Sequence, residues 1–185
     1  MKKDANGRQV LVIGAARQGL ALARYLARHQ YPVLVNDKRP EAELAAEIKA
    51  LRNLPVEWLL GTHDPAELKQ RPAMVCVSGG VPLDNPMVQY ALANGIHLTN
   101  DTQIFMELVP CKTLAITGSA GKTTTTTLLG RMAKTAEGGA YRKVWVGGNI
   151  GDPLINYLDE MEADDLAILE VSSFQSELMT TSMDI

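Results

Sequence analysis

A short loop of small residues that leads into a lysine and threonines is the segment of this chain best suited to chemistry. It comprises Thr117, Gly118, Ser119, Ala120, Gly121, Lys122, Thr123 and Thr124. Small residues let successive backbone N–H groups turn toward a phosphate chain, and a helix beginning at Lys122 adds partial positive charge. The lysine supplies a full charge for the β- and γ-phosphates, and the Thr123 hydroxyl can bind Mg²⁺. The segment predicts a nucleoside-triphosphate site, although Ile116 replaces the first glycine of the standard phosphate loop.

Two polar residues further along the chain follow apolar segments and could complete this chemistry. Glu170 ends the apolar run 166–169, a position from which a carboxylate can reach Mg²⁺ held by the phosphate loop. A solvent-facing strand end is the alternative interpretation of this glutamate. Asn149 lies in the segment Gly147–Gly151 and can both donate and accept hydrogen bonds. A turn after a strand would explain these glycines, but it would not require the asparagine.

A second ligand site is indicated near the N-terminus by the pattern G-x-A-x-x-G from Gly14 to Gly19. Asp37 follows 18 residues after Gly19, as in a degraded dinucleotide fingerprint, and a nicotinamide site is one interpretation. Ala16 argues against it, because a methyl group there would crowd the pyrophosphate. A plain tight turn is the other interpretation of the glycines.

Charged and small residues elsewhere in the first hundred positions also suit a phosphorylated ligand. Lys38 and Arg39 add positive charge directly after Asp37, although adjacent charges are more commonly a solvated surface pair. The segment Ser78–Pro82 follows a predicted strand, and loops at the carboxyl ends of parallel strands face the ligand crevice. A plain turn explains this loop equally well.

The elements that must position these residues alternate between strand and helix. Apolar runs predict strands over 10–13, 33–35, 56–60, 74–77 and 96–98. Helices are expected over 18–28, from Pro40 to about Leu51, over 65–70 and 86–94, and over 100–109. This alternation predicts a parallel, doubly wound, Rossmann-like sheet in an N-terminal domain of residues 1–109.

A second alternation begins after Pro110. It contains a strand from Thr113, a helix over 122–134, and strands over 144–146 and 166–169. The threonines at 123–127 are poor helix formers, so packing or a ligand must hold that turn. A phosphate-binding α/β domain normally has more than three strands. We therefore expect 110–185 to be the first part of a P-loop-type ATPase domain.

Composition restricts the remaining function classes. The 185 residues carry a net charge of −3, which argues against general nucleic-acid binding. No apolar run approaches the roughly 20 residues that span a bilayer, and no signal peptide is evident, so a cytoplasmic location is expected. Cys76 and Cys111 are too few for a disulfide scaffold, and the three scattered histidines receive no chemistry. The acidic cluster over 159–165 is expected to be solvated surface.

Taken together, these segments resemble the Mur ligase family of cytoplasmic cell-wall enzymes. The segments are Thr117–Thr124, Gly147–Gly151, Glu170–Gln175, and Gly14–Gly19 with Asp37–Arg39. The resemblance implies three domains: a UDP-binding Rossmann-like domain, a central ATPase domain and a C-terminal domain that lies beyond this chain. The Ser-Ser-Phe-Gln sequence after Glu170 is similar to that of the member that adds D-glutamate.

The resemblance also implies roles for residues at matching positions. Lys122 would contact the ATP phosphates, Thr123 and Glu170 would hold Mg²⁺, and Asn149 would contact the sugar nucleotide near its reacting end. The uridine diphosphate site would be lined by Arg17, Gln18, Asp37, Lys38, Arg39 and Gly80. Two positions depart from the family pattern, which often has glycine at Ala16 and proline at Gly79.

The reaction that the resemblance implies is ATP-dependent amide formation in peptidoglycan precursor synthesis. The substrates would be UDP-N-acetylmuramoyl-L-alanine and D-glutamate, and the intermediate an acyl phosphate. We expect a monomer without nucleic-acid or membrane partners, and no turnover by the 185 residues alone. Two alternatives remain open: a non-catalytic nucleotide-binding module, and an NAD-dependent oxidoreductase domain supported only by Gly14 to Asp37.

Overall fold

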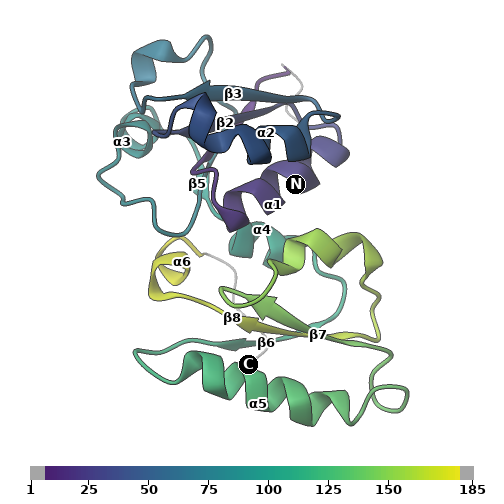
Figure 1. The fold of residues 1–185 in the computed structure, drawn as a ribbon. Helices are drawn as coiled ribbons and strands as arrows, with labels where there is room; N and C mark the ends of the chain where they lie inside the picture. Colours follow the sequence, from purple (N-terminus) through teal and green to yellow (C-terminus); the bar gives the residue numbers. More distant parts are fainter. Residues whose placement is uncertain (1–6, 180–185) are drawn as a thin grey trace. The chain divides into compact units, whose positions relative to one another are not determined.

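The computed structural model describes residues 7–179 of the chain. These residues form an α/β structure of two compact units, which divide between Asp101 and Thr102 (Figure 1). The sequence-based α/β class is confirmed, because both units contain parallel sheets. The expected domain boundary between residues 109 and 110 stays a prediction.

The first unit is built on a five-stranded parallel sheet in the order β3-β2-β1-β4-β5. Its strands are β1 (Val10–Ile13), β2 (Val33–Asp37), β3 (Val56–Leu60), β4 (Met74–Val77) and β5 (Leu98–Thr99). The chain order reverses between β1 and β4, which are neighbours in the sheet. In such sheets the ligand crevice lies at the carboxyl ends of the strands beside this switch point.

Helices connect the strands of this first sheet. They are α1 (Arg17–Arg28), α2 (Ala45–Leu51) and α3 (Pro86–Ala93), with short 3₁₀ segments at Glu41–Leu44 and Pro65–Glu67. Helix α4 (Asp101–Leu108) follows β5, and all of it after Asp101 belongs to the second unit. Helix α1 buries Leu22, Ala23 and Leu26, and strand β1 has Leu11, Val12 and Ile13 fully buried. These apolar faces form the core that holds the β1–α1 turn in place.

Three predicted elements of the first unit were wrong in type or extent. The helix expected from Pro40 to Leu51 is a 3₁₀ segment followed by α2. The helix expected over 65–70 is one 3₁₀ turn, because the chain is already extended at Leu68. The strand expected from Ile96 begins at Leu98, because the Ile96 N–H still donates to Ala91 at the end of α3.

The second unit contains a three-stranded parallel sheet in the order β6-β8-β7. The strands are β6 (Lys112–Ile116), β7 (Val144–Gly148) and β8 (Leu166–Glu170). Strand pairing places Ile116 and Gly148 on either side of Glu170. The carboxyl ends of all three strands therefore meet at this glutamate, which was predicted to end its strand.

Helix α5 (Lys122–Lys134) packs along this second sheet (Figure 1). The core beneath it includes Val144, Leu166 and Ile168. Within the threonine run, Thr126 is fully buried, so packing against the sheet offsets the low helix propensity of these residues. A 3₁₀ helix at Leu154–Glu160 and helix α6 at Ser173–Glu177 were not predicted.

The acidic cluster over 159–165 is not entirely the solvated surface that was expected. Asp165 is only 1% exposed. Its Oδ2 accepts hydrogen bonds from Arg142 at 2.6 Å and from the Trp145 indole at 2.8 Å. Burial raises the pKa of Asp165, but these hydrogen bonds outweigh that effect and lower it. This carboxylate is thus a structural anchor beside the β7–β8 pair.

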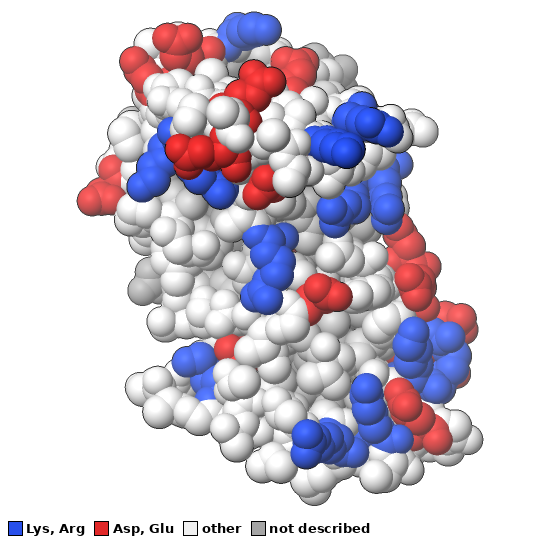
Figure 2. All heavy atoms as spheres, in the orientation of Figure 1, with Lys and Arg blue, Asp and Glu red and all other residues white. Residues whose placement is uncertain are grey.

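Charges on the surface are mixed in sign. On the face shown in Figure 2, basic and acidic side chains are interspersed, consistent with the small net charge of the chain. Across residues 7–179, none of the helices has both the length and the apolar character that crossing a bilayer would require.

Candidate functional site

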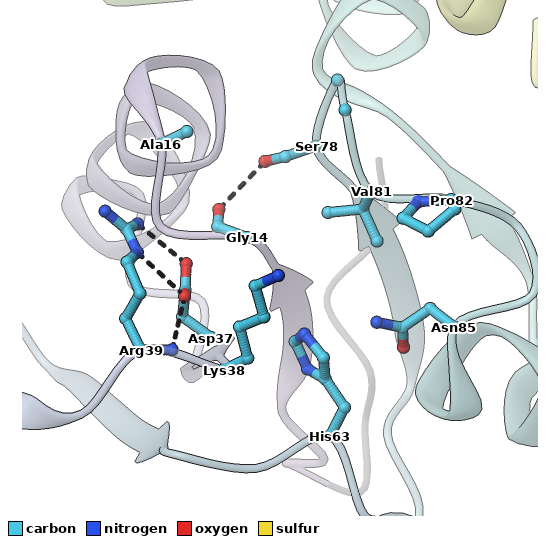
Figure 3. Close-up of a pocket in the computed structure, with 12 residues that line it drawn as sticks. Gly14, Ala16, Asp37, Lys38, Arg39, His63, Ser78, Val81, Pro82 and Asn85 are labelled. Atoms are coloured by element: carbon cyan, nitrogen blue, oxygen red, sulfur yellow. Dashed lines mark hydrogen bonds and ion pairs between the residues drawn. The ribbon is translucent and has the colours of Figure 1, made fainter.

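A pocket of about 310 Å³ lies at the carboxyl ends of β1, β2 and β4 in the first unit. Its lining comes from the β1–α1 turn, the end of β2, the loop after β3 and the loop after β4 (Figure 3). The lining residues are Gly14, Ala16, Asp37, Lys38, Arg39, His63, Ser78, Gly79, Gly80, Val81, Pro82 and Asn85. The pocket is therefore at the position where a doubly wound sheet binds its ligand.

Asp37 and Arg39 form a tightly bonded pair at the end of β2. Arg39 Nε donates to Asp37 Oδ1 at 3.0 Å and Nη2 donates to Oδ2 at 2.9 Å. The backbone N–H groups of Arg39 and Ala15 also donate to this carboxylate. Burial raises the pKa of Asp37, but the hydrogen bonds outweigh it and bring the pKa down to about 2. Asp37 therefore fixes the β1–α1 turn against the end of β2.

Positive charge in the pocket comes mainly from Lys38. The Arg39 guanidinium is engaged with Asp37 and also donates to the Ala15 carbonyl at 3.1 Å. Lys38 is exposed, and its side chain extends across the pocket in Figure 3. Of the predicted basic pair, Arg39 thus stabilises the loops and Lys38 has its amine in the pocket.

The loop after β4 is held against the β1–α1 turn. The Ser78 hydroxyl donates to the Gly14 carbonyl at 3.0 Å. A Cβ atom at Gly79 would lie 2.6 Å from Gln18 Oε1, so the Gln18 side chain occupies space that a larger residue would need. This contact gives a physical reason for glycine at position 79. Gly80 lines the pocket with a φ of 92°, a conformation that favours glycine.

The structure brings together four of the six residues predicted for the uridine diphosphate site: Asp37, Lys38, Arg39 and Gly80. Arg17 and Gln18 begin helix α1 beside the pocket residue Ala16 and lie outside the lining. Gln18 is buried and Arg17 is exposed.

Sequence reasoning missed two pocket residues, His63 and Asn85. His63 follows β3, and Asn85 precedes helix α3. The available signal was their position in loops that follow strands β3 and β4 of a predicted parallel sheet.

The predicted phosphate loop lies in the second unit, between β6 and α5. Residues 117–121 are exposed, and Gly118 and Gly121 have φ angles of 140° and 77°. The Lys122 ammonium group donates to the Gly118 carbonyl at 2.8 Å, so the lysine folds back over its own loop. The loop therefore has the open backbone and adjacent charge that a phosphate chain requires.

Thr123, Glu170 and Asn149 meet beside this loop. The Thr123 hydroxyl donates to Glu170 Oε2 at 2.8 Å, and Asn149 Nδ2 donates to Oε1 at 3.0 Å. Glu170 is only 3% exposed, so the alternative of a solvent-facing strand end is wrong. The hydroxyl and carboxylate oxygens are hard donors of the kind that Mg²⁺ prefers, so the set fits that cation.

The glycines beside Asn149 have a packing role that differs from the predicted loop. Gly147 and Gly148 belong to strand β7. A Cβ atom at Gly148 would lie 2.5 Å from the Glu170 carbonyl oxygen, and its φ is 100°. The Asn149 N–H donates to that same carbonyl at 2.8 Å. Glycine at 148 therefore lets the chain pass close to Glu170 and directs Asn149 toward its carboxylate.

Comparison with known protein families identifies both units. Residues 8–100 match the N-terminal domain of MurD-like Mur ligases, and residues 116–185 match the Mur ligase middle domain. A UDP-N-acetylmuramoylalanine–D-glutamate ligase from Geobacter metallireducens is 38% identical over 178 residues, which is 96% of this chain and 38% of that protein. The enzyme of the same name from Alkaliphilus metalliredigens is 39% identical over 176 residues, covering 94% and 38%. The chain thus spans about 38% of the length of these relatives.

Solved structures agree with the fold. A murein peptide ligase from Psychrobacter arcticus superposes with a TM-score of 0.54 at 20% identity, covering 90% of this chain and 39% of that chain. The UDP-N-acetylmuramate–alanine ligase of Thermotoga maritima superposes with a TM-score of 0.51 at 20% identity, covering 92% and 39%. Both superpositions cover at least 90% of this chain and support the α/β fold described above.

Proposed function

Because the chain belongs to the Mur ligase family, we propose that it forms part of an ATP-dependent ligase that adds D-glutamate to UDP-N-acetylmuramoyl-L-alanine. The observation that carries this proposal is the convergence of Thr123, Glu170 and Asn149 beside the phosphate loop. In the proposed reaction these groups would bring together the transferring phosphoryl group, Mg²⁺ and the substrate carboxylate that accepts the phosphoryl group. The proposed reaction is that of a protein with the full length of the relatives, of which this chain spans about 38%.

The phosphate loop supplies the groups for binding ATP. Lys122 would exchange its hydrogen bond to the Gly118 carbonyl for the β- and γ-phosphates, and the loop N–H groups would bind the phosphate oxygens. Thr123 and Glu170 would hold Mg²⁺, which when bound neutralises charge on the phosphates. Binding the cation would replace the direct hydrogen bond between these two side chains.

The reaction requires two anions to approach each other. The terminal carboxylate of UDP-N-acetylmuramoyl-L-alanine attacks the γ-phosphorus, and ADP leaves, giving an acyl phosphate. The D-glutamate amine then attacks the acyl carbon and releases inorganic phosphate and a proton, leaving an amide. Lys122 and the loop N–H groups lower the repulsion in the first step because they stabilise charge on the transferring phosphoryl group. Asn149 would position the attacking carboxylate from its place beside Glu170.

The pocket of the first unit is the proposed site for the uridine diphosphate portion of the sugar nucleotide. The exposed amine of Lys38 would attract the diphosphate. The Asp37–Arg39 pair fixes the surrounding loops, so the pocket is formed before the ligand arrives. Gly80 would allow close approach of the ligand to the backbone.

The choice of D-glutamate rests on the sequence after Glu170 and on the relatives. In the structure, Ser172 and Gln175 form a capping box at the start of α6. Gln175 Nε2 also donates to the Thr102 hydroxyl at 2.7 Å, which joins α6 to α4 within the second unit. This part of the Ser-Ser-Phe-Gln segment therefore has a structural role in addition to any role in recognition. The cytoplasmic location and the monomeric state stay predictions.

Calorimetric titration of the chain with UDP-N-acetylmuramoyl-L-alanine, with NAD as competitor, tests the proposal. We expect saturable binding that NAD does not displace, because the pocket has Ala16 where a dinucleotide fingerprint has its second glycine. Binding of NAD without binding of the sugar nucleotide would instead support the oxidoreductase alternative. Binding of neither compound would contradict the proposed role of the pocket.

A further inference from the structure

His63 and Asn85 line the pocket, and neither belongs to the predicted uridine diphosphate site. His63 comes from the loop after β3 and is half-buried, whereas Asn85 precedes α3 and is only 6% exposed. In Figure 3 both side chains border the pocket, together with Lys38. Each has one polar atom committed to the protein and a second polar atom left for a ligand.

A buried asparagine determines which nitrogen of His63 carries the proton. Asn36 is fully buried, and its Nδ2 donates to the carbonyls of Leu59 and Thr62, both at 2.8 Å. These two carbonyls fix the amide orientation, so Oδ1 must face His63 as an acceptor. His63 Nδ1 lies 2.6 Å from that oxygen and therefore carries a hydrogen. In the neutral imidazole, Nε2 is then a hydrogen-bond acceptor.

A helix cap fixes the orientation of Asn85 in the same way. Its Oδ1 accepts a hydrogen bond from the Met87 N–H at 2.9 Å, as the N-cap of α3. The Nδ2 group is consequently on the other side of the amide, and Figure 3 shows this nitrogen directed into the pocket. Asn85 therefore offers the ligand a hydrogen-bond donor.

We infer that His63 Nε2 and Asn85 Nδ2 form an acceptor–donor pair that selects a ligand with an N–H group beside a carbonyl, as in the uracil ring. The inference rests on the proposed function, because it deepens the assignment of the pocket to a uridine nucleotide. The N–H of the ring would donate to His63, and a ring carbonyl would accept from Asn85. Cytosine presents the opposite pattern, with an acceptor nitrogen beside an amino donor, so it would leave both protein groups without partners.

Protonation of His63 would reverse its part in this recognition. A proton on Nε2 converts the acceptor to a donor, while the Nδ1 hydrogen bond to Asn36 is kept. Burial lowers the pKa of His63; Asp37 opposes this effect and Lys38 adds to it. Arg39 pairs with Asp37 and so offsets its charge. The acceptor form consequently holds at neutral pH and is lost as the pH falls through the lowered pKa.

The experiment is calorimetric titration of the whole chain with UDP and with CDP at about pH 8 and about pH 5.5. The two nucleotides carry the same diphosphate. Any effect of its protonation on binding is therefore the same for both and cancels in the ratio of their affinities. We expect a preference for UDP of about tenfold or more at the higher pH, because CDP leaves two groups unpaired. The preference should shrink at the lower pH.

Two substitutions separate recognition from folding. His63→Leu removes the acceptor, and it should reduce the preference for UDP over CDP and remove its dependence on pH, because Asn85 remains as a donor. Asn85→Asp keeps an oxygen for the Met87 N–H and replaces the donor with an acceptor. It should weaken UDP binding by about tenfold and weaken CDP binding less. Melting temperatures close to that of the unsubstituted chain would show that both variants are folded.

The outcomes distinguish this inference from the proposed function. If the chain binds UDP-N-acetylmuramoyl-L-alanine but shows equal affinity for UDP and CDP, the inference is wrong and the proposed function stands. A UDP preference that both folded variants retain, or an equal loss of both nucleotides in the variants, also overturns it. If neither the sugar nucleotide nor UDP binds, the proposed function and this inference are both wrong.

Discussion

The two candidate sites lie at the same kind of place, the carboxyl ends of parallel strands, but their polar groups are organised differently. In the first unit, Asp37 accepts hydrogen bonds from Arg39 and Ala15, and Asn36 holds His63. In the second unit, the Lys122 ammonium group donates to a carbonyl of its own exposed loop. The first site therefore combines groups fixed by protein partners with the exposed Lys38, whereas the second site has its lysine and N–H groups on an exposed loop, where a proposed phosphate ligand could bind them.

This difference suits the two halves of the proposed reaction. A pocket whose groups are already fixed can select a nucleotide by the pattern of donors and acceptors at little cost in ordering. A phosphate loop must instead meet a large negative charge that changes during the reaction. The lysine can exchange its Gly118 partner for phosphate oxygens without leaving a buried group unsatisfied, because the loop is exposed.

The largest effect is expected from adding a methyl group at Gly19, where helix α1 passes very close to neighbouring backbone in the first unit. A Cβ atom at Gly19 would overlap with both the Gly14 carbonyl oxygen and Ser78 Oγ. We expect Gly19→Ala to lower the free energy of unfolding by about 3 kcal/mol, because backbone atoms must move. Chemical denaturation measures this change.

The control for Gly19→Ala is Gly139→Ala in the second unit. Its added methyl group would come no closer than 3.7 Å to the Ala136 carbonyl oxygen. We expect a change within about 0.5 kcal/mol, as for ordinary surface substitutions. If both variants lost a similar amount of free energy of unfolding, an added methyl group would destabilise the tight β1–α1 turn no more than a loop of the second unit.

The strands could be predicted from the sequence because each buried parallel strand is a short apolar run. The runs at Val10, Met74 and Leu166 appear as strands β1, β4 and β8, and α5 has the predicted bounds. Short segments after Pro40 and Pro65 could not be assigned as 3₁₀ or α from local sequence. Whether these segments form 3₁₀ or α-helical hydrogen bonds depends on the tertiary contacts of the chain that follows them.

The next largest effect is expected from removing the charge of the phosphate loop. Lys122→Ala should reduce Mg-ATP affinity by at least about a hundredfold, because a full charge beside the β- and γ-phosphates is lost. Binding of the sugar nucleotide should be unchanged, since the proposed pocket lies wholly within the first unit. Calorimetry with each ligand measures both effects.

Lys134→Ala is the matched control, since it removes the same charge from the other end of α5. This exposed lysine should have little effect on either ligand. If Lys122→Ala weakened both ligands equally while Lys134→Ala weakened neither, the two sites would not be independent, and the comparison between them would fail.

A smaller effect is expected from the carboxylate that organises the first pocket. The pKa of folded Asp37 is about 2, below the ordinary value of 3.8 for an aspartate side chain. Its stabilisation is therefore present above about pH 4 and is lost as the pH falls through about 2. We expect Asp37→Asn to lower the free energy of unfolding by about 1–2 kcal/mol at neutral pH, allowing for the partly exposed Arg39 partner.

Acid denaturation distinguishes this charge effect from a packing effect. Asp37→Asn should flatten the dependence of stability on pH between about pH 4 and pH 2. Asp64→Asn changes an exposed carboxylate that caps a 3₁₀ turn, and the pH dependence should stay close to that of the unsubstituted chain. An unchanged slope in Asp37→Asn would mean that the pair with Arg39 does not stabilise the pocket.

The sites could be predicted only where a motif carries its own chemistry. The phosphate loop and Glu170 are recognisable because lysine, threonine and carboxylate follow strands at fixed positions. The roles of Asp165 and His63 could not be recognised, since each depends on a partner about 20 or more residues away, Trp145 and Asn36 respectively. The number of residues between two positions does not reveal whether the fold brings them within hydrogen-bond distance.

The smallest effect is expected at the Ser-Ser-Phe-Gln segment, and it tests whether the second unit also contains fixed polar contacts. The Ser172 hydroxyl accepts from the Gln175 N–H at 3.2 Å and donates to Gln175 Oε1 at 3.1 Å. Ser172→Ala should lower the free energy of unfolding by about 1 kcal/mol, the usual value of a helix N-cap, in chemical denaturation. Ser173→Ala, which changes an exposed neighbour, should cost less. If both substitutions lowered the free energy of unfolding equally, the Ser172 hydroxyl would have no special structural role. Recognition of D-glutamate would then be the reason for a serine at this position.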